Sequence, residues 1–273
     1  MIFVYKTWER FCAELKERGL ISIPACEVCQ KKYLVLKHDV ETNVASALKM
    51  AVIENKYGHR GSFYVQAYLL EELQNIEMLR KIQELGHEVS YHYDVLDSCK
   101  GNIELALAEF QKNKKLFEDN GFKIKTVCQH GNPVVERIGY TSNRDFFRND
   151  KVKEEYPEIF DIMVNYKEGY NTDYTYFSDA GRKFKLIFDP INNDVINSDD
   201  KNVPFNNLNE LLPYLKLGNC IISTHPHRWM NSSVKYVLRT MLFKVVKLVA
   251  KIVMKIPFFK KIMSKYYYLA KKI

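Results

Sequence analysis

Residues 33–40 read YLVLKHDV, a nearly continuous apolar run that ends in polar residues. A short run of this kind is typical of a strand that is buried on both faces of a sheet. After it, Thr42 or Asn43 can cap a helix that closes near Gly58, and a second apolar run, SFYVQ, begins at Ser62. Short apolar runs that alternate with amphipathic segments predict an α/β domain with a parallel sheet.

The alternation continues along the chain. We expect helices over residues 71–85 and 102–120, because each segment is followed by a glycine, a common helix stop. Residues 140–183 are rich in Asn, Asp and Tyr, and there we expect helices and long loops. Further strands are expected at HEVSYHYD (87–94), KIKTVCQH (123–130), FKLIFDP (184–190) and NCIISTHP (219–226).

The composition is that of a folded protein. The chain has 273 residues, 47% of them hydrophobic and 27% charged, which argues against wholesale disorder and against a protein with many membrane spans. Six cysteines are spread over hydrophobic segments, and residues 1–11 lack a long apolar signal core. These features predict a reducing, cytoplasmic compartment. Cys26 and Cys29 form a lone CxxC pair, which we interpret as two ordinary thiols in a loop.

The positive charge is concentrated at the C-terminus. The chain has 41 basic and 33 acidic residues, a formal charge of +8. Twelve of the basic residues follow residue 227, and all the acidic residues precede it, so residues 1–227 hold 29 bases against 33 acids. The body therefore offers no basic excess for nucleic acid, and we predict no nucleic-acid partner.

Reactive side chains collect at the ends of the expected strands. Asp39 and Glu41 end the first strand, and the later strands end with His92 and Asp94, with His130, and with His225 and His227. Strand ends share one rim in a (β/α) barrel, and residues two apart on a strand point the same way. Carboxylates and imidazoles together suit a divalent metal, zinc first, with cobalt, manganese or iron as alternatives. A single histidine of this kind is more often a surface or capped residue, so the expectation rests on their number.

Five segments in order resemble a known family: LKHDVE, GSFYVQ, ELGHEVSYHYD, VCQHGNP and ISTHPHRW. They resemble the motif series of the polysaccharide deacetylases, the NodB-homology or carbohydrate esterase family 4 group, over about residues 33–230. The similarity is to a divergent branch with HDVD-like and LHYD-like motifs. It implies a distorted (β/α)₇ barrel, and a metal-dependent hydrolase that removes N- or O-acetyl groups from sugars.

The resemblance also implies roles for individual residues. We place Asp39, His92 and Asp94 on the metal, with Glu41 as the base and His225 as the acid. Two departures leave alternatives open. Val40 separates the two acids that are adjacent in the family, so Asp39 could instead be the base. Leu96 stands where the family has a second histidine, whose place Asp94 or His130 could take.

Five residues are candidate substrate contacts. His130 and Asn132 stand where the family usually has an arginine that orients the base. Asp179 and Arg182 could bind sugar hydroxyls or a phosphate, although a solvated turn is an equal interpretation. Trp229 could stack on a sugar ring or belong to the core.

The chain divides into an N-terminal lead-in (1–32), the barrel (33–230) and a basic amphipathic tail (234–273). In the tail, lysines interrupt an apolar segment every three or four residues, which is typical of a surface helix rather than of one that spans a bilayer. We expect it to bind the inner face of an anionic membrane, the alternative being a helix packed on the body or on a partner. The leading hypothesis is a peripheral sugar deacetylase acting on a surface glycan or its lipid- or nucleotide-linked precursor. The alternative is an inactive barrel that binds glycans or acts as a scaffold at the membrane.

Overall fold

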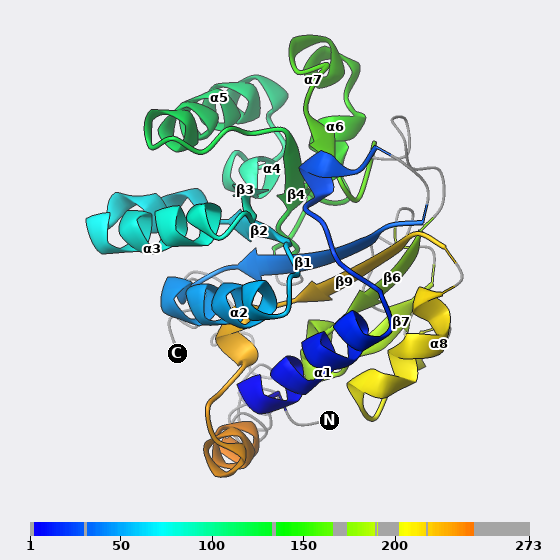
Figure 1. Cartoon of the computed structure of the whole chain (residues 1–273). Helices are drawn as coiled ribbons and strands as arrows, with labels where there is room; N and C mark the ends of the chain where they lie inside the picture. Colours follow the sequence, from blue (N-terminus) through cyan, green and yellow to red (C-terminus); the bar gives the residue numbers. More distant parts are fainter. Residues whose placement is uncertain are drawn as a thin grey trace.

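The computed structural model describes residues 3–29, 32–132, 135–165, 174–188, 190, 202–216 and 218–242. They form one curved sheet with helices packed around it (Figure 1). Within these residues the sheet has nine strands: β1 (Leu34–Val40), β2 (Ser62–Val65), β3 (Glu88–Tyr93), β4 (Thr126–Gln129), β5 (Phe160–Asp161), β6 (Thr175–Ser178), β7 (Lys185–Ile187), β8 (Val203–Pro204) and β9 (Cys220–Thr224).

The strands follow the order β5-β4-β3-β2-β1-β9-β6-β7-β8. The seven strands from β5 to β6 in this order are parallel to their neighbours, and β7 and β8 add an antiparallel edge. The predicted α/β class and parallel sheet are thus confirmed. Among the residues that the structure describes, no ladder joins β5 to β8, so closure into a complete barrel stays a prediction.

The sequence located most of the strands. Each of the six expected apolar runs contains a strand, namely β1, β2, β3, β4, β7 and β9. Three strands were missed: β5 and β6, which are short and lie in the polar stretch 140–183, and β8, which has only two residues. The miss matters because β6 is parallel to β9 and carries Asp179 directly after its last residue.

The helices expected after Asn43, over residues 71–85 and over residues 102–120 are confirmed. Asn43 caps α2 by accepting a hydrogen bond from the backbone N–H of Ser46 at 3.0 Å. Gly86, whose φ is +86°, follows the end of α3 in the left-handed conformation that favours glycine. The α-helices are α1 (Tyr5–Glu17), α2 (Val44–Lys56), α3 (Leu73–Glu84), α4 (Val95–Ser98), α5 (Ile103–Asp119), α6 (Asp145–Arg148), α7 (Asp150–Glu155) and α8 (Leu212–Leu215), and short 3₁₀ helices span Ala25–Glu27, Ala67–Glu71, Ala180–Arg182, Leu208–Leu211 and Pro226–Arg228.

Helix α1 packs into the core, although it lies within the predicted N-terminal lead-in (1–32). Trp8 and Phe11 are at most 1% exposed and share a cluster with Leu34 and Leu36 of β1. The indole N–H of Trp8 donates a hydrogen bond to Glu54 of α2 at 2.9 Å. Burying two such aromatic side chains contributes roughly 1.5–3 kcal/mol each, so α1 stabilises the sheet that carries the site.

Strand β1 presents alternate residues to two environments. Leu34 and Leu36 face the helices, whereas Val35 lies in a separate interior cluster with Tyr64 and Tyr176 from other strands. Since side chains alternate along a strand, Lys37 and Asp39 share the interior face with Val35. The polar end of the strand is therefore directed into the space that the curved sheet encloses.

The described chain ends in a helix over residues 233–242. Tyr236 is buried, but the apolar residues around it are 39% to 69% exposed: Val234, Val237, Leu238, Met241 and Leu242. Within the described ranges, no helix combines the length and the apolar character that crossing a bilayer requires. Residues 243–273, which hold most of the predicted basic tail, lie outside the described residues.

Candidate active site

A buried ion pair lies at the centre of the site. The ammonium of Lys37 is 2.5 Å and 2.6 Å from the two carboxylate oxygens of Asp39, and it donates a further hydrogen bond to Ser223 Oγ at 3.2 Å. Lys37 is 1% and Asp39 is 6% exposed. Burial alone would raise the pKa of Asp39, but Lys37, His92 and His225 outweigh it and hold the pKa at about 2. Asp39 is therefore ionised and already paired with a cation.

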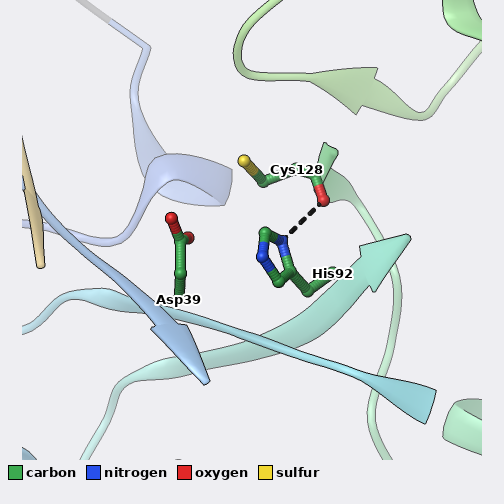
Figure 2. A group of neighbouring side chains, drawn as sticks. All are labelled: Asp39, His92 and Cys128. Atoms are coloured by element: carbon green, nitrogen blue, oxygen red, sulfur yellow. Dashed lines mark hydrogen bonds between the residues drawn. The ribbon is translucent and has the colours of Figure 1, made fainter. Parts of the chain in front are cut away.

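Two overlapping groups of side chains could hold a metal ion. One consists of Asp39, His92 and Cys128, and the other of Glu41, His92 and His130, with the donor atoms of each group within 4.8 Å of one another. Figure 2 shows the first group, in which side chains from β1, β3 and β4 face a common space. Carboxylate, imidazole and thiolate are all ligands of zinc, so the donor sets fit the predicted metal.

His92 belongs to both groups, and its ring is held by a backbone carbonyl of the adjacent strand β4. Its Nδ1 atom lies 3.0 Å from the carbonyl oxygen of Cys128, to which it donates a hydrogen bond (Figure 2). This leaves Nε2 as the atom that can bind a cation. Burial lowers the pKa of His92 to about 3, against the opposing effect of Asp39. The imidazole is therefore neutral near pH 7, the form in which histidine binds a metal.

His130 lies between two acidic side chains, Glu41 and Asp94. Its Nε2 atom is 3.4 Å from Glu41 Oε1, and its Nδ1 atom is 3.8 Å from Asp94 Oδ2. Burial opposes ionisation of Glu41, but the bond to His130 and the charge of His225 hold its pKa well below the usual range. Asp94, a predicted ligand, belongs to neither candidate group and lies on the far side of His130. The candidate groups contain Cys128 or His130 in its place.

His225, the predicted acid, is held by Asp179. Its Nδ1 atom is 2.5 Å from Asp179 Oδ1, and its backbone N–H donates to Asp179 Oδ2 at 3.1 Å. Arg228 also donates to Asp179, at 3.1 Å to Oδ1 and 2.7 Å to the carbonyl oxygen. Burial would raise the pKa of Asp179, but His225 and Arg228 lower it. Asp179 thus orients His225, whereas the sequence had suggested it as a substrate contact.

The Nε2 atom of His225 points at the two acids of the first motif. It lies 3.8 Å from Asp39 Oδ2 and 3.7 Å from Glu41 Oε1. Both predicted catalytic residues and two of the three predicted ligands, Asp39 and His92, therefore meet in one place. The carboxyl ends of β1, β3 and β9 supply these side chains, and the end of β6 supplies Asp179.

The remaining predicted contacts fall around the site or outside it. Asn132 is partly exposed, and its carbonyl oxygen accepts a hydrogen bond from Arg137 at 2.8 Å. Arg182 is also partly exposed, and burial together with Arg228 lowers its pKa. Trp229 is 2% exposed, with its ring centroid 5.2 Å from those of Phe3 and Trp8. That burial leaves no ring face for a sugar, so Trp229 is corrected to a core residue.

His38 lies on the opposite face of β1 from Asp39. Its Nδ1 is 2.7 Å from Thr224 Oγ1 and its Nε2 is 2.8 Å from Glu54, at a site with no exposure. It belongs to the packing between β1 and α2. Sequence reasoning also missed Lys37 and Cys128. The signal that could have found them is the two-residue period, since Lys37 shares a face with Asp39, and Cys128 shares one with His130.

Comparisons with known proteins give structural likenesses alone. No protein-family model matches the sequence, and no curated protein matches it. Among solved structures, a family 4 carbohydrate esterase from Streptomyces lividans is 16% identical, with a TM-score of 0.40 over 76% of this chain and 84% of that one. A peptidoglycan deacetylase from Bacillus subtilis is 13% identical, with a TM-score of 0.40 over 82% of this chain and 96% of that one.

A third solved structure is described as a pseudoenzyme of the same carbohydrate esterase family, from Bacillus anthracis. It is 13% identical, with a TM-score of 0.39 over 85% of this chain and 66% of that one. At such identities and TM-scores, what this protein does has to be inferred from its own side chains. The chain is thus similar in structure to a family 4 carbohydrate esterase, a peptidoglycan deacetylase and a pseudoenzyme of the esterase family.

Proposed function

We propose that the protein is a metal-dependent hydrolase that removes an acetyl group from a sugar. One observation carries the proposal: His225, oriented by Asp179, directs its Nε2 atom to within 4 Å of two carboxylates that belong to the candidate metal groups. Hydrolysis of an amide or ester needs a base for the water and an acid for the leaving group. Imidazole and carboxylate groups of this site can serve in both roles.

The residues divide the reaction between them. A metal bound here would polarise the acetyl carbonyl and lower the pKa of a water molecule. Asp39 or Glu41 accepts the proton of the attacking water. The bond from the acetyl carbon to the sugar nitrogen or oxygen then breaks, and His225 Nε2 gives a proton to that leaving atom. Asp179 stabilises the imidazolium form of His225 that must exist before this transfer.

Two of the predicted substrate contacts carry groups that bind hydroxyls and anions. Asn132 and Arg182 are partly exposed, so they can reach a ligand outside the buried cluster. An amide and a guanidinium suit sugar hydroxyls or a phosphate. They support a sugar as substrate, including one linked to a lipid or a nucleotide through phosphate.

A second candidate function is an inactive barrel that binds a glycan or acts as a scaffold. It is favoured by the Lys37–Asp39 pair, because an internal ammonium already compensates the acid beside the predicted metal. In such an inactive barrel, Lys37 would balance the charge of Asp39 without a divalent ion. The two candidates differ in whether the purified protein binds metal and releases acetate.

The test measures both properties on the full chain. Purified protein is analysed for bound divalent metal, and acetate release is measured from N-acetylated and O-acetylated sugars. We expect the protein to contain bound metal. We expect a chelator to abolish acetate release, and zinc or cobalt to restore it. His225→Ala and His92→Ala should each lower the rate at least 100-fold, on the order of a general-acid contribution. Lys115→Ala, at an exposed position on α5, is the matched control. A protein that binds no divalent ion and releases no acetate would be the inactive barrel.

We also propose that the protein binds the inner face of an anionic membrane through its C-terminal region. The exposed apolar residues of the helix 233–242 lie at positions 234, 237, 238, 241 and 242, a helical spacing that forms one stripe. From Arg228 onward the sequence has twelve basic residues and no acidic ones. An apolar stripe with unbalanced positive charge is typical of segments that bind anionic bilayers. This placement supports a substrate linked to lipid on the cytoplasmic side.

A further inference from the structure

The two candidate metal groups share His92 but differ in charge balance. In the group with Cys128, the carboxylate is Asp39, and both of its oxygens are within 2.6 Å of the Lys37 ammonium. Lys37 is held there by Ser223 and lies 3.5 Å from the hydroxyl of Tyr176. A divalent ion on Asp39 would place a second cation beside this buried ammonium, where repulsion is screened far less than in water.

The group with His130 differs: among the described residues, no lysine or arginine pairs with its carboxylate. Its carboxylate, Glu41, faces the Nε2 atoms of His130 and His225 at 3.4 Å and 3.7 Å. Each of its imidazoles has an acceptor behind the other ring nitrogen: the Cys128 carbonyl for His92 at 3.0 Å, and Asp94 for His130 at 3.8 Å. An acceptor behind the ligating imidazole is the usual arrangement of a metal-bound histidine.

An unsatisfied atom points the same way. The Nδ1 atom of His130 is buried and makes no hydrogen bond within the described part of the chain, although Asp94 lies 3.8 Å away. A small rotation of the His130 ring would bring this N–H to Asp94. Asp94 then orients a ligand instead of being one, which explains why it lies outside both groups.

We propose that the metal is bound by Glu41, His92 and His130, and that Lys37 keeps Asp39 out of the ligand set so that Asp39 serves as the base. The assignment rests on the hydrolase function proposed above. It reverses the roles first expected for Asp39 and Glu41. Lys37 is a positioning residue: it fixes both oxygens of Asp39 from two positions earlier on the same strand. Asp39 Oδ2 then lies 3.8 Å from His225 Nε2, so the base and the acid lie side by side at the carboxyl edge of the sheet.

The experiment measures metal binding to the full chain with Zn²⁺ by calorimetry and with Co²⁺ by absorption. We expect Glu41→Gln and His130→Ala to weaken Zn²⁺ binding by about 100-fold or more, since loss of an orienting residue alone costs about 10- to 100-fold. Cys128→Ser is the matched control and should bind within about threefold of wild type, because a residue that is not a ligand adds no bond to the metal. The Co²⁺ protein should lack the near-ultraviolet charge-transfer band of a cobalt–thiolate bond.

Removing the base should separate binding from catalysis. Asp39→Asn alone would leave Lys37 buried without a carboxylate, so the double variant Lys37→Met with Asp39→Asn, which removes both charges, is measured beside it. The double variant should bind Zn²⁺ within about threefold of wild type and lose acetate release. Circular dichroism and the unfolding midpoint establish that each variant folds.

The outcomes distinguish this assignment from the proposed function. If wild type binds Zn²⁺ but the double variant does not, or if the Co²⁺ protein shows a thiolate band that Cys128→Ser removes, the assignment is overturned and the hydrolase stands. If wild type binds neither metal and releases no acetate, both are overturned. Full Zn²⁺ affinity in Glu41→Gln would also overturn the assignment alone.

Discussion

Asp179 and His225 are 46 residues apart in sequence, yet His225 Nδ1 lies 2.5 Å from Asp179 Oδ1. The contact exists because β6 and β9 are neighbouring parallel strands, paired from Thr175 and Cys220 to Ser178 and Ser223. Asp179 directly follows the last residue of β6 and His225 directly follows the last residue of β9, so the two meet at the same edge of the sheet. Arg228 closes the arrangement from the 3₁₀ helix that follows β9.

Asp179→Asn should reduce acetate release by about 100- to 10,000-fold, because the amide keeps the shape but removes the charge that stabilises the imidazolium form of His225. Zn²⁺ affinity should stay unchanged, since Asp179 contacts none of the candidate ligands in the structure. The measurements are initial rates and calorimetry on the same preparation. Asp119→Asn, at an exposed position on α5, is the control, and equal rates in the two variants would contradict a role for Asp179.

Glu54 should be essential for stability, because three partners depend on it. It accepts a hydrogen bond from Trp8, pairs with His38 at 2.8 Å, lies 3.8 Å from His87 and is fully buried. Glu54→Ala leaves these groups unpaired and should lower the free energy of unfolding by about 3–5 kcal/mol. For a chain of this size the smaller value corresponds to a fall of roughly 6–12 °C in the melting temperature.

Thermal and denaturant unfolding of Glu54→Ala check this prediction. Glu77→Ala is the matched control, since Glu77 is an exposed glutamate on the neighbouring helix α3. The control should unfold within about 0.5 kcal/mol of wild type. A similarly small change in Glu54→Ala would show that the buried network contributes little.

Asp161 should make stability depend on pH. It accepts hydrogen bonds from the Tyr93 hydroxyl and from the backbone N–H of Met163. Burial nevertheless raises its pKa from 3.8 to about 6. Between these two values the folded protein keeps a proton on Asp161 that the unfolded chain has lost. Stability from this group is therefore present at low pH and is lost as the pH rises through 6, by about 3 kcal/mol in all.

Asp161→Asn has no proton to lose in this range. The difference in unfolding free energy between the variant and wild type should therefore shift in favour of the variant as the pH rises from 4 to 7. Urea unfolding at several pH values measures it, and other titrating groups cancel in the difference. Asp150→Asn, on the surface of α7, should show a nearly constant difference. A constant difference for Asp161→Asn as well would refute the raised pKa of Asp161.

Membrane binding should depend on the apolar stripe of the helix 233–242 and on charge. Leu238→Asp combined with Met241→Asp should release the protein from vesicles that contain anionic lipid, because both side chains are about 60% exposed on the stripe. Deletion of residues 234–273 should move the protein from the membrane fraction to the soluble one. High salt should weaken attachment of the intact chain.

Flotation with vesicles of anionic or neutral lipid measures this binding. Leu73→Asp, at an exposed leucine on α3 outside the stripe, is the matched control and should still bind. If the double variant floats with anionic vesicles as wild type does, the stripe is not the membrane contact. Covering of the stripe by a second copy of the chain would appear instead as a change in mass on light scattering.

The sequence by itself determined the parallel α/β sheet, since apolar runs and helical spacing are local patterns that reflect burial. It also placed Asp39, His92 and His225 at strand ends, and strand ends of parallel strands share an edge. It could not assign Asp39, Glu41 and Asp179 to separate roles, because a carboxylate's role depends on which charge lies beside it. Only the tertiary structure decided that Lys37 pairs with Asp39, that Asp179 holds His225, and that Trp229 is buried behind α1. Those contacts depend on strand register and on packing between segments far apart in the chain, which no local pattern records.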